Sequence, residues 1–522
     1  MGTIAVHAQR DPNGVAVIYG NGDFVETWCE LEQRSRRLGH LLRVRGIGPG
    51  GCVAGVVAND DPVFMDLFWA CHRIGVYFTP VNWHLQEPEI QYIVDDCDAD
   101  ALVVSPRFAE AAARVAPQCP KAQVRIVTAG LAPAGFESLA DALAEVPAEA
   151  PLEDQREGSI MLYSSGTTGR PKGVRRPLPD GPPGEPITAA FAKGFMALFG
   201  LNGEQRYLVP APLYHAAPLG WATNLMRLGA TAVIMPRFDP ELALQMIQGQ
   251  RVTASQWVPT HFRRLLQLPE SVRAQYDVSS LRFAVHAAAP CPIPVKERMI
   301  AWWGDAIVEY YAGTEGGGTI VRAGEWLERK GTVGRHWSGG KVWILDAAGN
   351  EVTQPGVEGA IYFETPPGMA GFSYHKDPEK TAGSYRGNLF TLGDIGYLDE
   401  GGYLFLTDRQ SNMIISGGVN IYPQEAENLL VTHPAVADVA VIGVPHPEFG
   451  EEVKAVVELV EPGRAGPELA AELIAFCEQH LSKIKCPRSV DFEAKLPRAE
   501  NGKLYKRRLR DRYWQGHETR IV

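Results

Sequence analysis

Apolar and polar positions along this chain follow two alternating patterns. Short apolar runs bounded by polar or turn-forming residues predict buried β-strands, and four of them are Val53–Ala58, Ala101–Val104, Val124–Thr128 and Thr231–Met235. Between such runs, apolar residues recur every three to four positions, which is typical of helices. Strands that alternate with helices predict an α/β fold in which the sheets are largely parallel.

After the first run, the strand-like pattern changes to a helical one. Asp60 and Asp61 have side chains suited to capping a helix, and Pro62 suits its first turn. The apolar positions that follow lie on one predicted helical face: Phe64, Leu67, Phe68 and Cys71.

The pattern changes near Asp408, where we place a domain boundary. Beyond it, a strand pair leads to a helix from Gln424, and the runs Val436–Val444 and Ala455–Val460 predict two further strands. This order is typical of a compact α+β unit. We therefore expect a large N-terminal domain over residues 1–408 and a small C-terminal domain over residues 409–522.

Composition excludes several classes of protein. The 522 residues carry a formal net charge of −11, which argues against nucleic acid as a partner. No run approaches about 18 apolar residues, so no membrane span is expected, and a charged residue follows the N-terminus too early for a secretory signal. The eight cysteines form no Cys-x-x-Cys pair and should be reduced, which favours a cytoplasmic location. A homodimer is left open.

The strongest local signal for function is the run Ser164–Gly173, which directly follows the apolar stretch Ile160–Tyr163. Its glycines let backbone amides turn toward an anion, its hydroxyl groups donate hydrogen bonds, and Lys172 adds positive charge. The run lacks the spacing of a Walker A loop. A phosphate-binding loop and a mobile surface loop both remain open from these residues alone. The proline-rich stretch Arg175–Pro186 cannot continue a helix or a central strand, so we place it at the surface.

Four further motifs follow this loop in order. They are Tyr310–Glu315, Thr391–Asp394, Asp408-Arg409 with Met413–Pro423, and Pro497–Lys503. Together the five motifs resemble the signatures of the adenylate-forming superfamily, which includes acyl-CoA synthetases, the adenylation domains of peptide synthetases and firefly luciferase. The resemblance covers nearly the whole chain. It implies a large adenylate-forming domain with mixed and parallel sheets, a small mobile α+β domain, and the use of ATP, Mg²⁺ and coenzyme A.

The implied reaction has two steps. A carboxylate attacks the α-phosphorus of ATP, which releases pyrophosphate and leaves an acyl-AMP, and the acyl group then passes to coenzyme A. By the match, Thr314 would contact the α-phosphate, Glu315 would hold Mg²⁺ through hard oxygen ligands, and Lys503 would bridge the acyl carboxylate and the α-phosphate. Without the motif match, Glu315 could equally be an ordinary turn residue, and Lys503 would be interpreted as a solvated lysine. The β- and γ-phosphates would be held by Ser164, Ser165, Gly166, Thr167, Thr168, Gly169 and Lys172.

The resemblance also implies a nucleoside site. Tyr311 would stack on adenine, and Asp394 with Arg409 would bind the ribose hydroxyl groups. An isolated Asp or Arg is more often part of a surface ion pair of small energy, so these roles depend on the motif match. The opposite wall of the adenine site would be Ala288, Ala289 and Pro290.

The implied acyl pocket has His215 as a gate, although a histidine after a tyrosine is by itself more typical of a hydrogen-bonded core residue. Its other expected residues are His286, Ala287, Ala312 and Gly313. Amino-acid-activating relatives carry Asp where this chain has Ala216, and acetate-activating relatives carry Trp at Ala312. With Gly316–Gly318 nearby, the walls are expected to be small and apolar. This predicts a large hydrophobic acid, either a medium- or long-chain fatty acid or a bulky alicyclic or aromatic acid.

The second step would use a rotation of the small domain. The family hinge falls at Ser411, where many relatives have Asp or Lys, and rotation about it would exchange Lys503 for Gly417 and Gly418 at the site. The basic stretch from Lys495 to Arg512 is interpreted as a solvated helix face, with a contact to a CoA phosphate as the alternative.

Three function classes follow. An acid–CoA ligase fits the Ile415–Pro423 segment best, a stand-alone adenylating enzyme that loads an acyl carrier protein is the alternative, and a non-catalytic binding protein is disfavoured. The last is disfavoured because Glu315, Asp394, Arg409 and Lys503 are all present. The partners expected are therefore a small carboxylic acid, ATP and coenzyme A.

Overall fold

The computed structural model describes residues 3–147, 151–164, 171–185, 193–194, 196–366, 368, 370–409, 412–416, 419–447, 449–498 and 504–515. The side chains of Ser164 and Arg409 lie outside this description although their backbone is within it. The other predicted site residues outside it are Ser165, Gly166, Thr167, Thr168, Gly169, Ser411, Gly417, Gly418 and Lys503.

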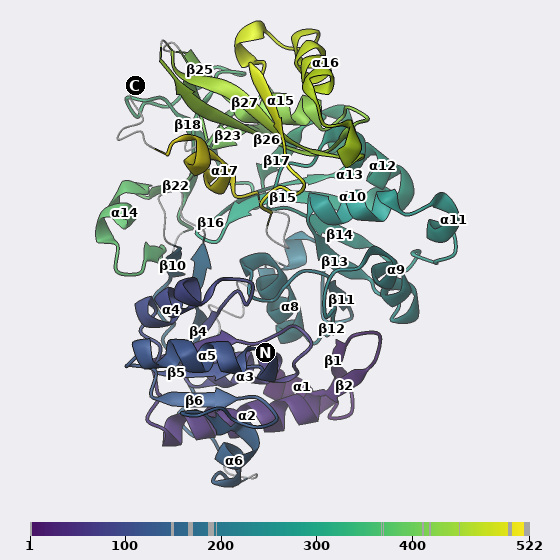
Figure 1. The fold of residues 1–522 in the computed structure, drawn as a ribbon. Helices are drawn as coiled ribbons and strands as arrows, with labels where there is room; N and C mark the ends of the chain where they lie inside the picture. The colour runs from purple at the N-terminus through teal and green to yellow at the C-terminus, as the bar shows by residue number, and fades with distance from the viewer. Residues whose placement is uncertain are drawn as a thin grey trace.

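The largest sheet joins a parallel half to an antiparallel half (Figure 1). Its parallel half has the strand order β15-β14-β13-β11-β12-β1. The bounds of these strands are β1 Val15–Tyr19, β11 Arg206–Val209, β12 Thr231–Ile234, β13 Ala254–Trp257, β14 Phe283–His286 and β15 Ile307–Gly313. Strand β12 confirms the predicted run at Thr231.

The rest of this sheet is antiparallel, so the expectation of largely parallel sheets holds for only half of it. Its order continues from β15 as β16-β17-β23-β22-β19-β18, with β21 beside β22 and β2 at the far edge beside β1. Their bounds are β2 Phe24–Thr27, β16 Gly316–Arg322, β17 Thr332–His336, β18 Val342–Leu345, β19 Gly359–Glu364, β21 Tyr385–Arg386, β22 Leu389–Leu398 and β23 Leu404–Arg409. Neighbours such as β15 and β16, or β22 and β23, are joined by short connections, which allow them to pair antiparallel.

A second sheet is parallel throughout its described strands, in the order β7-β6-β5-β3-β4-β8. Its strands are β3 Cys52–Val56, β4 Tyr77–Pro80, β5 Ala101–Val104, β6 Val124–Val127, β7 Glu137–Ser138 and β8 Ser159–Ile160. A small antiparallel sheet, β20-β10-β9, has the strands β9 Leu162–Ser164, β10 Lys172–Arg175 and β20 Ser373–Tyr374. The predicted runs at Val53, Ala101 and Val124 are thus confirmed as strands.

The C-terminal unit has its own sheet, in the order β25-β24-β27-β26 with β28 beside β27, and lies at the top of Figure 1. Its strands are β24 Ile414–Ser416, β25 Val419–Ile421, β26 Val436–His446, β27 Gly450–Leu459 and β28 Ser489–Phe492. Strand β23 still pairs with β22 up to Arg409. The chain therefore passes from one sheet to the other between Arg409 and Ile414, beside the boundary expected at Asp408.

Helices cover both faces of the parallel strands, as parallel sheets require. Those of the large unit are α1 Ile4–Arg10, α2 Trp28–Val44, α3 Val63–Arg73, α4 Glu87–Asp96, α5 Ala109–Val115, α6 Leu139–Ala144, α8 Ala216–Leu228, α9 Pro240–Gly249, α10 Pro259–Gln267, α11 Glu270–Arg273, α12 Ile293–Trp303, α13 Ala323–Glu328 and α14 Pro378–Gly383. Those of the C-terminal unit are α15 Pro423–Leu430, α16 Pro467–Glu478 and α17 Lys506–Tyr513. Among the described helices, none has the length and apolar character needed to cross a bilayer.

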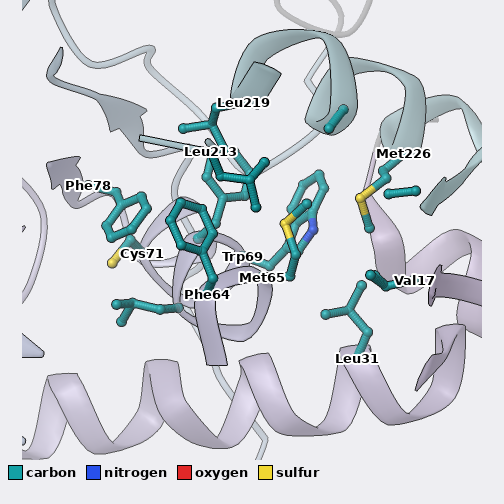
Figure 2. Close-up of a cluster of buried hydrophobic side chains, with 14 of the residues drawn as sticks. Val17, Leu31, Phe64, Met65, Trp69, Cys71, Phe78, Leu213, Leu219 and Met226 are labelled. Atoms are coloured by element: carbon teal, nitrogen blue, oxygen red, sulfur yellow. The ribbon is translucent and has the colours of Figure 1, made fainter. Parts of the chain in front are cut away.

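Helix α3 is the centre of the largest core, between α2 and α8 (Figure 2). All its residues are buried, so no face of this helix is exposed to solvent, unlike the one-sided helix that the sequence predicted. The ring of Phe64 meets that of Phe78 edge-on at 5.6 Å, and full burial of such a ring stabilises the fold by about 1.5–3 kcal/mol. Asp61 caps the helix by accepting a hydrogen bond from the Val63 amide at 3.1 Å.

Two acidic side chains are buried together beside this core. Glu26 on β2 and Asp66 on α3 are 0% and 3% exposed. Arg34 on α2 contacts both, at 3.5 Å from Glu26 Oε1 and 2.7 Å from Asp66 Oδ2. Burial, followed by the nearby charge of Asp66, raises the pKa of Glu26 from 4.5 to about 9. One arginine therefore faces two carboxyl groups that cannot both ionise cheaply.

This pair predicts a pH-dependent stability. Because the pKa of Glu26 is raised in the folded chain, the folded state binds a proton that the unfolded state has released, and stability falls as the pH rises from about 5 to about 9. Glu26→Gln should remain neutral and flatten that decline, whereas Glu110→Gln, at an exposed position, should not. Thermal unfolding midpoints between pH 5 and 9 measure the effect. Parallel curves for the parent and Glu26→Gln would show that Glu26 is not the responsible group.

Candidate active site

A cleft of about 1470 Å³ opens where the parallel half of the large sheet meets the C-terminal unit. Its walls come from the carboxyl ends of four parallel strands: Ala211 after β11, Val258 after β13, Ala287 after β14 and Tyr311 on β15. The carboxyl edge of a parallel sheet is the usual place for a ligand, because the loops there are free of the sheet's own hydrogen bonds. The C-terminal unit closes the cleft with residues that include Asp438, Arg498, Leu504 and Lys506.

Tyr311 and Asp394 meet on one wall of this cleft. The Tyr311 hydroxyl group donates a hydrogen bond to Asp394 Oδ2 at 2.6 Å, although the two residues lie on β15 and β22. Asp394 stands opposite Arg409 in the β22–β23 pairing. The residues predicted to bind adenine and ribose are therefore neighbours, and the hydrogen bond fixes the edge of the tyrosine ring.

Thr314 and Glu315 form the turn between β15 and β16. Gly313 pairs with Gly316 across this turn, and Gly316 has a φ of 122°, a conformation that suits glycine. The Glu315 carboxylate accepts a hydrogen bond from the Tyr374 hydroxyl group at 2.9 Å. The backbone carbonyl group of Glu315 accepts one from the Arg176 side chain at 2.6 Å. The turn is thus held from two sides, which fixes the direction of the Glu315 side chain.

Neither Tyr374 nor Arg176 was identified from the sequence. Arg176 belongs to the proline-rich stretch expected at the surface, whose described residues beyond Arg176 are indeed exposed or half-buried. Burial lowers the pKa of Arg176, and burial followed by the charge of Glu315 raises the pKa of the Tyr374 hydroxyl group. No local pattern distinguishes these two residues, because their partner lies far away in the chain.

Lys172 lies on β10, opposite Ser164 on β9, so the predicted phosphate loop joins two antiparallel strands. The Lys172 ammonium group contacts Asp377 Oδ2 at 2.5 Å and lies 5.8 Å from the centre of the Tyr374 ring. This ion pair, first among several causes, lowers the pKa of Asp377. Lys172 lines the cleft, and Asp377 positions its charge there.

The segment after β14 adds a further wall. Ala287, Ala288, Ala289 and Pro290 all line the cleft. Ala288 has a φ of 73°, a left-handed conformation that costs a residue with a Cβ about 1–2 kcal/mol. Such strain is typically found where a chain must hold one geometry at a functional site.

The predicted acyl pocket lies between α8 and the large sheet. His215 precedes the first turn of α8 and packs on Tyr214, with ring centres 4.4 Å apart. Ala312 lines the cleft and packs against the core on the α8 side of the sheet, as Ala287 does. Further lining residues of this region include Trp221 and Asn224 on α8, Gln256 on β13 and Tyr310 on β15.

His286 does not lie on the wall where the sequence analysis placed it. It is fully buried, packs on Phe262 at 5.3 Å, and stands opposite Trp257 and Glu309 on the other face of the sheet. Side chains alternate along a strand, so Ala287 faces α8 and His286 cannot. Burial, followed by the charge of Lys296, holds the pKa of His286 well below 6.5.

Gly316–Gly318 do not make open walls either. A Cβ on Gly317 would meet the Phe363 ring at 2.6 Å, and one on Gly318 would meet the Trp337 ring at 2.1 Å. The space that the glycines leave is therefore filled by aromatic rings. Gly313, by contrast, is among the residues that line the cleft.

The two units meet through a small group of charges at the mouth of the cleft. Asp438 on β26 accepts a hydrogen bond from Arg498 at 2.8 Å and lies 3.6 Å from Arg263 on α10. Arg498 also pairs in an isolated bridge with Leu504. Arg498, within the terminal lysine motif, and Leu504, directly after it, therefore both line the cleft.

Much of the basic stretch near the C-terminus is already paired. Lys506 lies 2.8 Å from Glu427, and Arg512 lies 2.7 Å from Glu493. Arg507 pairs with Asp511, and Arg508 lies 3.5 Å from Glu89 of the large unit. Arg507, Arg508 and Arg512 are exposed, as expected of a solvated helix face, whereas Lys506 is largely buried against Glu427 and lines the cleft.

Comparison with known proteins places these features in context. The sequence matches the AMP-binding enzyme family over residues 4–373 and the AMP-binding enzyme C-terminal domain over residues 425–503. It is 34% identical over 512 residues to a feruloyl-CoA synthase of Amycolatopsis sp, with 97% of both chains covered. It is 29% identical over 535 residues to the fatty acid–[acyl-carrier-protein] ligase ScoC of Streptomyces coeruleorubidus, with 100% of this chain and 97% of the relative covered.

A solved structure is also similar. The crystal structure of the anthranilate CoA ligase AuaEII in complex with anthranoyl-AMP superposes with a TM-score of 0.83 at 25% identity. The match covers 98% of this chain and 97% of that one.

The charges at the mouth predict how the two units are held. Arg263→Ala removes the contact between units but leaves Arg498 on Asp438. The Arg263–Asp438 contact is long, at 3.6 Å, with side chains 23% and 11% exposed, and we expect it to contribute up to about 1 kcal/mol. Open arrangements of the C-terminal unit should therefore become about two- to fivefold more populated. Energy transfer between dyes placed by unnatural amino acids at the exposed positions 110 and 468 measures the distribution.

The matched control is Arg264→Ala, because Arg264 is the exposed neighbour on the same helix. High salt should mimic Arg263→Ala in the parent and have less effect in the variant. An unchanged distance distribution in Arg263→Ala would show that other contacts hold the units together.

Proposed function

The chain belongs to the family of AMP-binding enzymes, and from this we propose an ATP-dependent acid–CoA ligase that activates a large hydrophobic or aromatic acid. In the first step a carboxylate oxygen attacks the α-phosphorus of ATP, the bond to pyrophosphate breaks, and acyl-AMP forms. In the second step the sulfur of CoA attacks the acyl carbonyl carbon and AMP leaves. The reaction class is that of an AMP-forming acid–thiol ligase.

One observation supports this proposal above the others. A single cleft contains the Tyr311–Asp394 pair, the Thr314–Glu315 turn, Arg498 of the terminal lysine motif and Leu504 directly after that motif. These residues come from two separate units and three distant parts of the chain. They meet where an acid and a nucleotide must be held together, so each can act on the same pair of reactants.

The roles that we propose are mainly electrostatic. Both reactants are anions, so groups that stabilise the charge developing on the α-phosphate lower the barrier. Thr314 contacts that phosphate in our proposal, and Lys503 bridges it to the acyl carboxylate. Lys172, positioned by Asp377, holds the outer phosphates together with Ser164–Gly169. Tyr311 with Ala288–Pro290 encloses the adenine, and Asp394 with Arg409 binds the ribose.

The site fits Mg²⁺ with Glu315 as its protein ligand. The Glu315 carboxylate lines the cleft, and the Tyr374 hydroxyl group orients it through one oxygen. In the described part of the chain, no cluster of three or more His, Cys, Asp or Glu side chains could hold an ion by itself. Mg²⁺ usually takes one or two carboxylates plus phosphate oxygens and water, so Glu315 and the phosphates of ATP are a sufficient set. When bound, the ion would neutralise phosphate charge.

We propose that residues 1–408 and 409–522 act as two domains that rotate about Ser411. In the present arrangement Arg498 of the lysine motif and Leu504 directly after it line the cleft. Ser416, which precedes Gly417 and Gly418, is buried on β24 and is not among the lining residues. This arrangement suits the first step, and rotation would bring the glycines to the site for CoA. The eight unpaired thiols support a cytoplasmic location.

The acceptor distinguishes this proposal from its alternative, an enzyme that loads an acyl carrier protein. ScoC is named as a ligase of that kind, whereas the feruloyl-CoA synthase is named for a CoA product. A panel of fatty, alicyclic and aromatic acids in a pyrophosphate-release assay identifies the acid. Product analysis with free CoA or with acyl carrier protein then identifies the acceptor. Thioester formed only on the carrier protein would favour the alternative.

Lys503→Ala tests the division between the two steps. The variant should lower acyl-AMP formation by about 10²–10³-fold, the effect of losing one electrostatic stabiliser. It should still convert supplied acyl-AMP and CoA into thioester at nearly the parent rate. Lys495→Ala, an exposed lysine near the same motif, is the control for both steps. A similar loss in both steps of Lys503→Ala would contradict the assigned role.

Ala312→Trp tests the position of the acyl pocket. A tryptophan there should fill the space between α8 and β15 and shift preference toward short acids. Overpacking should also destabilise the fold by about 1–3 kcal/mol, so thermal unfolding is measured alongside. Ala347→Trp at an exposed position should leave the acid preference unchanged. A folded Ala312→Trp variant with the parent's preference would place Ala312 outside the acyl site.

A further inference from the structure

One side of helix α8 lines the predicted acyl pocket along most of the helix. The lining residues Ala217, Gly220, Trp221 and Asn224 recur every three to four positions and therefore share one face. They descend from His215, which precedes the first turn of the helix. Asn224 is nine residues below His215, which corresponds to about 14 Å along a helix. Asn224 therefore lies at the far end of the pocket.

A second amide faces the same space from the sheet. Strand β13 places Ala254 in the core on the α8 side and Trp257 in the core on the opposite side. Because side chains alternate along a strand, Gln256 faces α8 together with Ala254. Gln256 lines the cleft although it is only 1% exposed.

The Gln256 amide is not fully hydrogen-bonded within the described part of the chain. Gln256 Nε2 donates to the Trp257 carbonyl group at 2.7 Å, but Gln256 Oε1 is buried and accepts no hydrogen bond from the described residues. Since Nε2 is already matched to a carbonyl group, exchanging the amide atoms would not satisfy the oxygen. Asn224 is half-buried.

The rest of the pocket is apolar and partly aromatic. The rings of Trp221 and Tyr310 lie 5.8 Å apart with an interplanar angle of 59°. A Cβ on Gly220 would meet no atom within 4 Å, so this turn of the helix leaves open space. Flat rings pack well on such walls.

The two amide side chains would serve no purpose in a pocket that binds only apolar groups. A pocket for a purely apolar acid gains nothing from an amide oxygen without a donor, because a buried polar group without a partner is destabilising. No described donor of the protein forms a hydrogen bond with Gln256 Oε1, so a bound ligand is a natural source of the missing hydrogen.

We propose that Gln256 and Asn224 bind a hydrogen-bond donor, a hydroxyl or amino group, on the ring of an aromatic carboxylic acid, at the end remote from the carboxylate. The Gln256 oxygen accepts the hydrogen, and the Asn224 amide, which can both donate and accept, binds the same group. This inference rests on the proposed function, because it concerns the acid-binding part of the same cleft. It narrows the substrate class from hydrophobic acids in general to ring-hydroxylated or ring-aminated ones.

The test measures binding separately from turnover. Non-reactive acyl-sulfamoyl adenosines stand in for the acyl-AMP, and three are compared: the 3-phenylpropenoyl compound and its para- and meta-hydroxy forms. Dissociation constants are determined calorimetrically for the parent, Gln256→Leu and Asn224→Leu. Gln118→Leu, at an exposed position remote from the cleft, is the matched control, and thermal unfolding verifies that each variant is folded.

The parent and Gln118→Leu should bind at least one hydroxylated compound about tenfold or more tightly than the unsubstituted one. Gln256→Leu should lose that advantage while binding the unsubstituted compound at least as well as the parent, and Asn224→Leu should reduce the advantage. Equal binding of all three compounds by the parent, or an equal loss for all three in the folded variants, would overturn the inference.

Failure of the proposed function gives a different result. If the parent discriminates the hydroxylated compounds but forms no CoA thioester from the matching acids, the acceptor assignment is wrong and the inference about the pocket stands. If thioester forms readily but the hydroxyl group makes no difference to binding, the proposed function stands and the inference is wrong.

Discussion

The alternation of side chains along β13, β14 and β15 is the constraint on which the site depends. These parallel strands end at one edge, where their loops form the cleft. Residues that face α8, such as Gln256, Ala287 and Ala312, lie on the acyl side, while Trp257, Ala284 and Ile307 on the same three strands face a different core. A one-residue shift in any of these strands would exchange the two sets and bury the wrong side chains. The register of the sheet therefore determines the chemistry of the pocket.

Hydrogen bonds between distant segments then prepare the cleft for its anionic ligands. Glu315 is held by Tyr374 and Arg176, and Tyr311 is held by Asp394. A group that is already oriented needs little rearrangement when a ligand arrives, which is the main source of electrostatic stabilisation in enzymes. The backbone of Ala288 adds to this, because its left-handed conformation is held by the surrounding fold. The ligand site thus combines a strained backbone at Ala288 with side chains that are already oriented by hydrogen bonds.

The two units are joined differently from the layers within each unit. Inside the large unit, α3 is buried on all sides and ties α2, α8 and the sheets into one core. Between the units, by contrast, we find partly exposed ion pairs such as Arg263–Asp438 and Arg508–Glu89. Contacts of this kind are weak and easily exchanged with water. The large unit is therefore tied together by a continuous buried core, whereas the C-terminal unit is held to it in part by charged side chains, as the proposed rotation would require.

The sequence by itself determined the elements and the list of residues to be gathered. Strand β5 covers the predicted run Ala101–Val104 residue for residue, and the family motifs named Tyr311, Glu315 and Asp394, which lie together in the cleft. Periodicity and motif spacing are local properties, so they can be read without the fold. Only the tertiary structure decided that His286 faces away from the pocket, that aromatic rings fill the space beside Gly317 and Gly318, and that Tyr374 and Gln256 belong to the site. These outcomes depend on which face of a strand is covered and by what, and that is set by residues far apart in the chain.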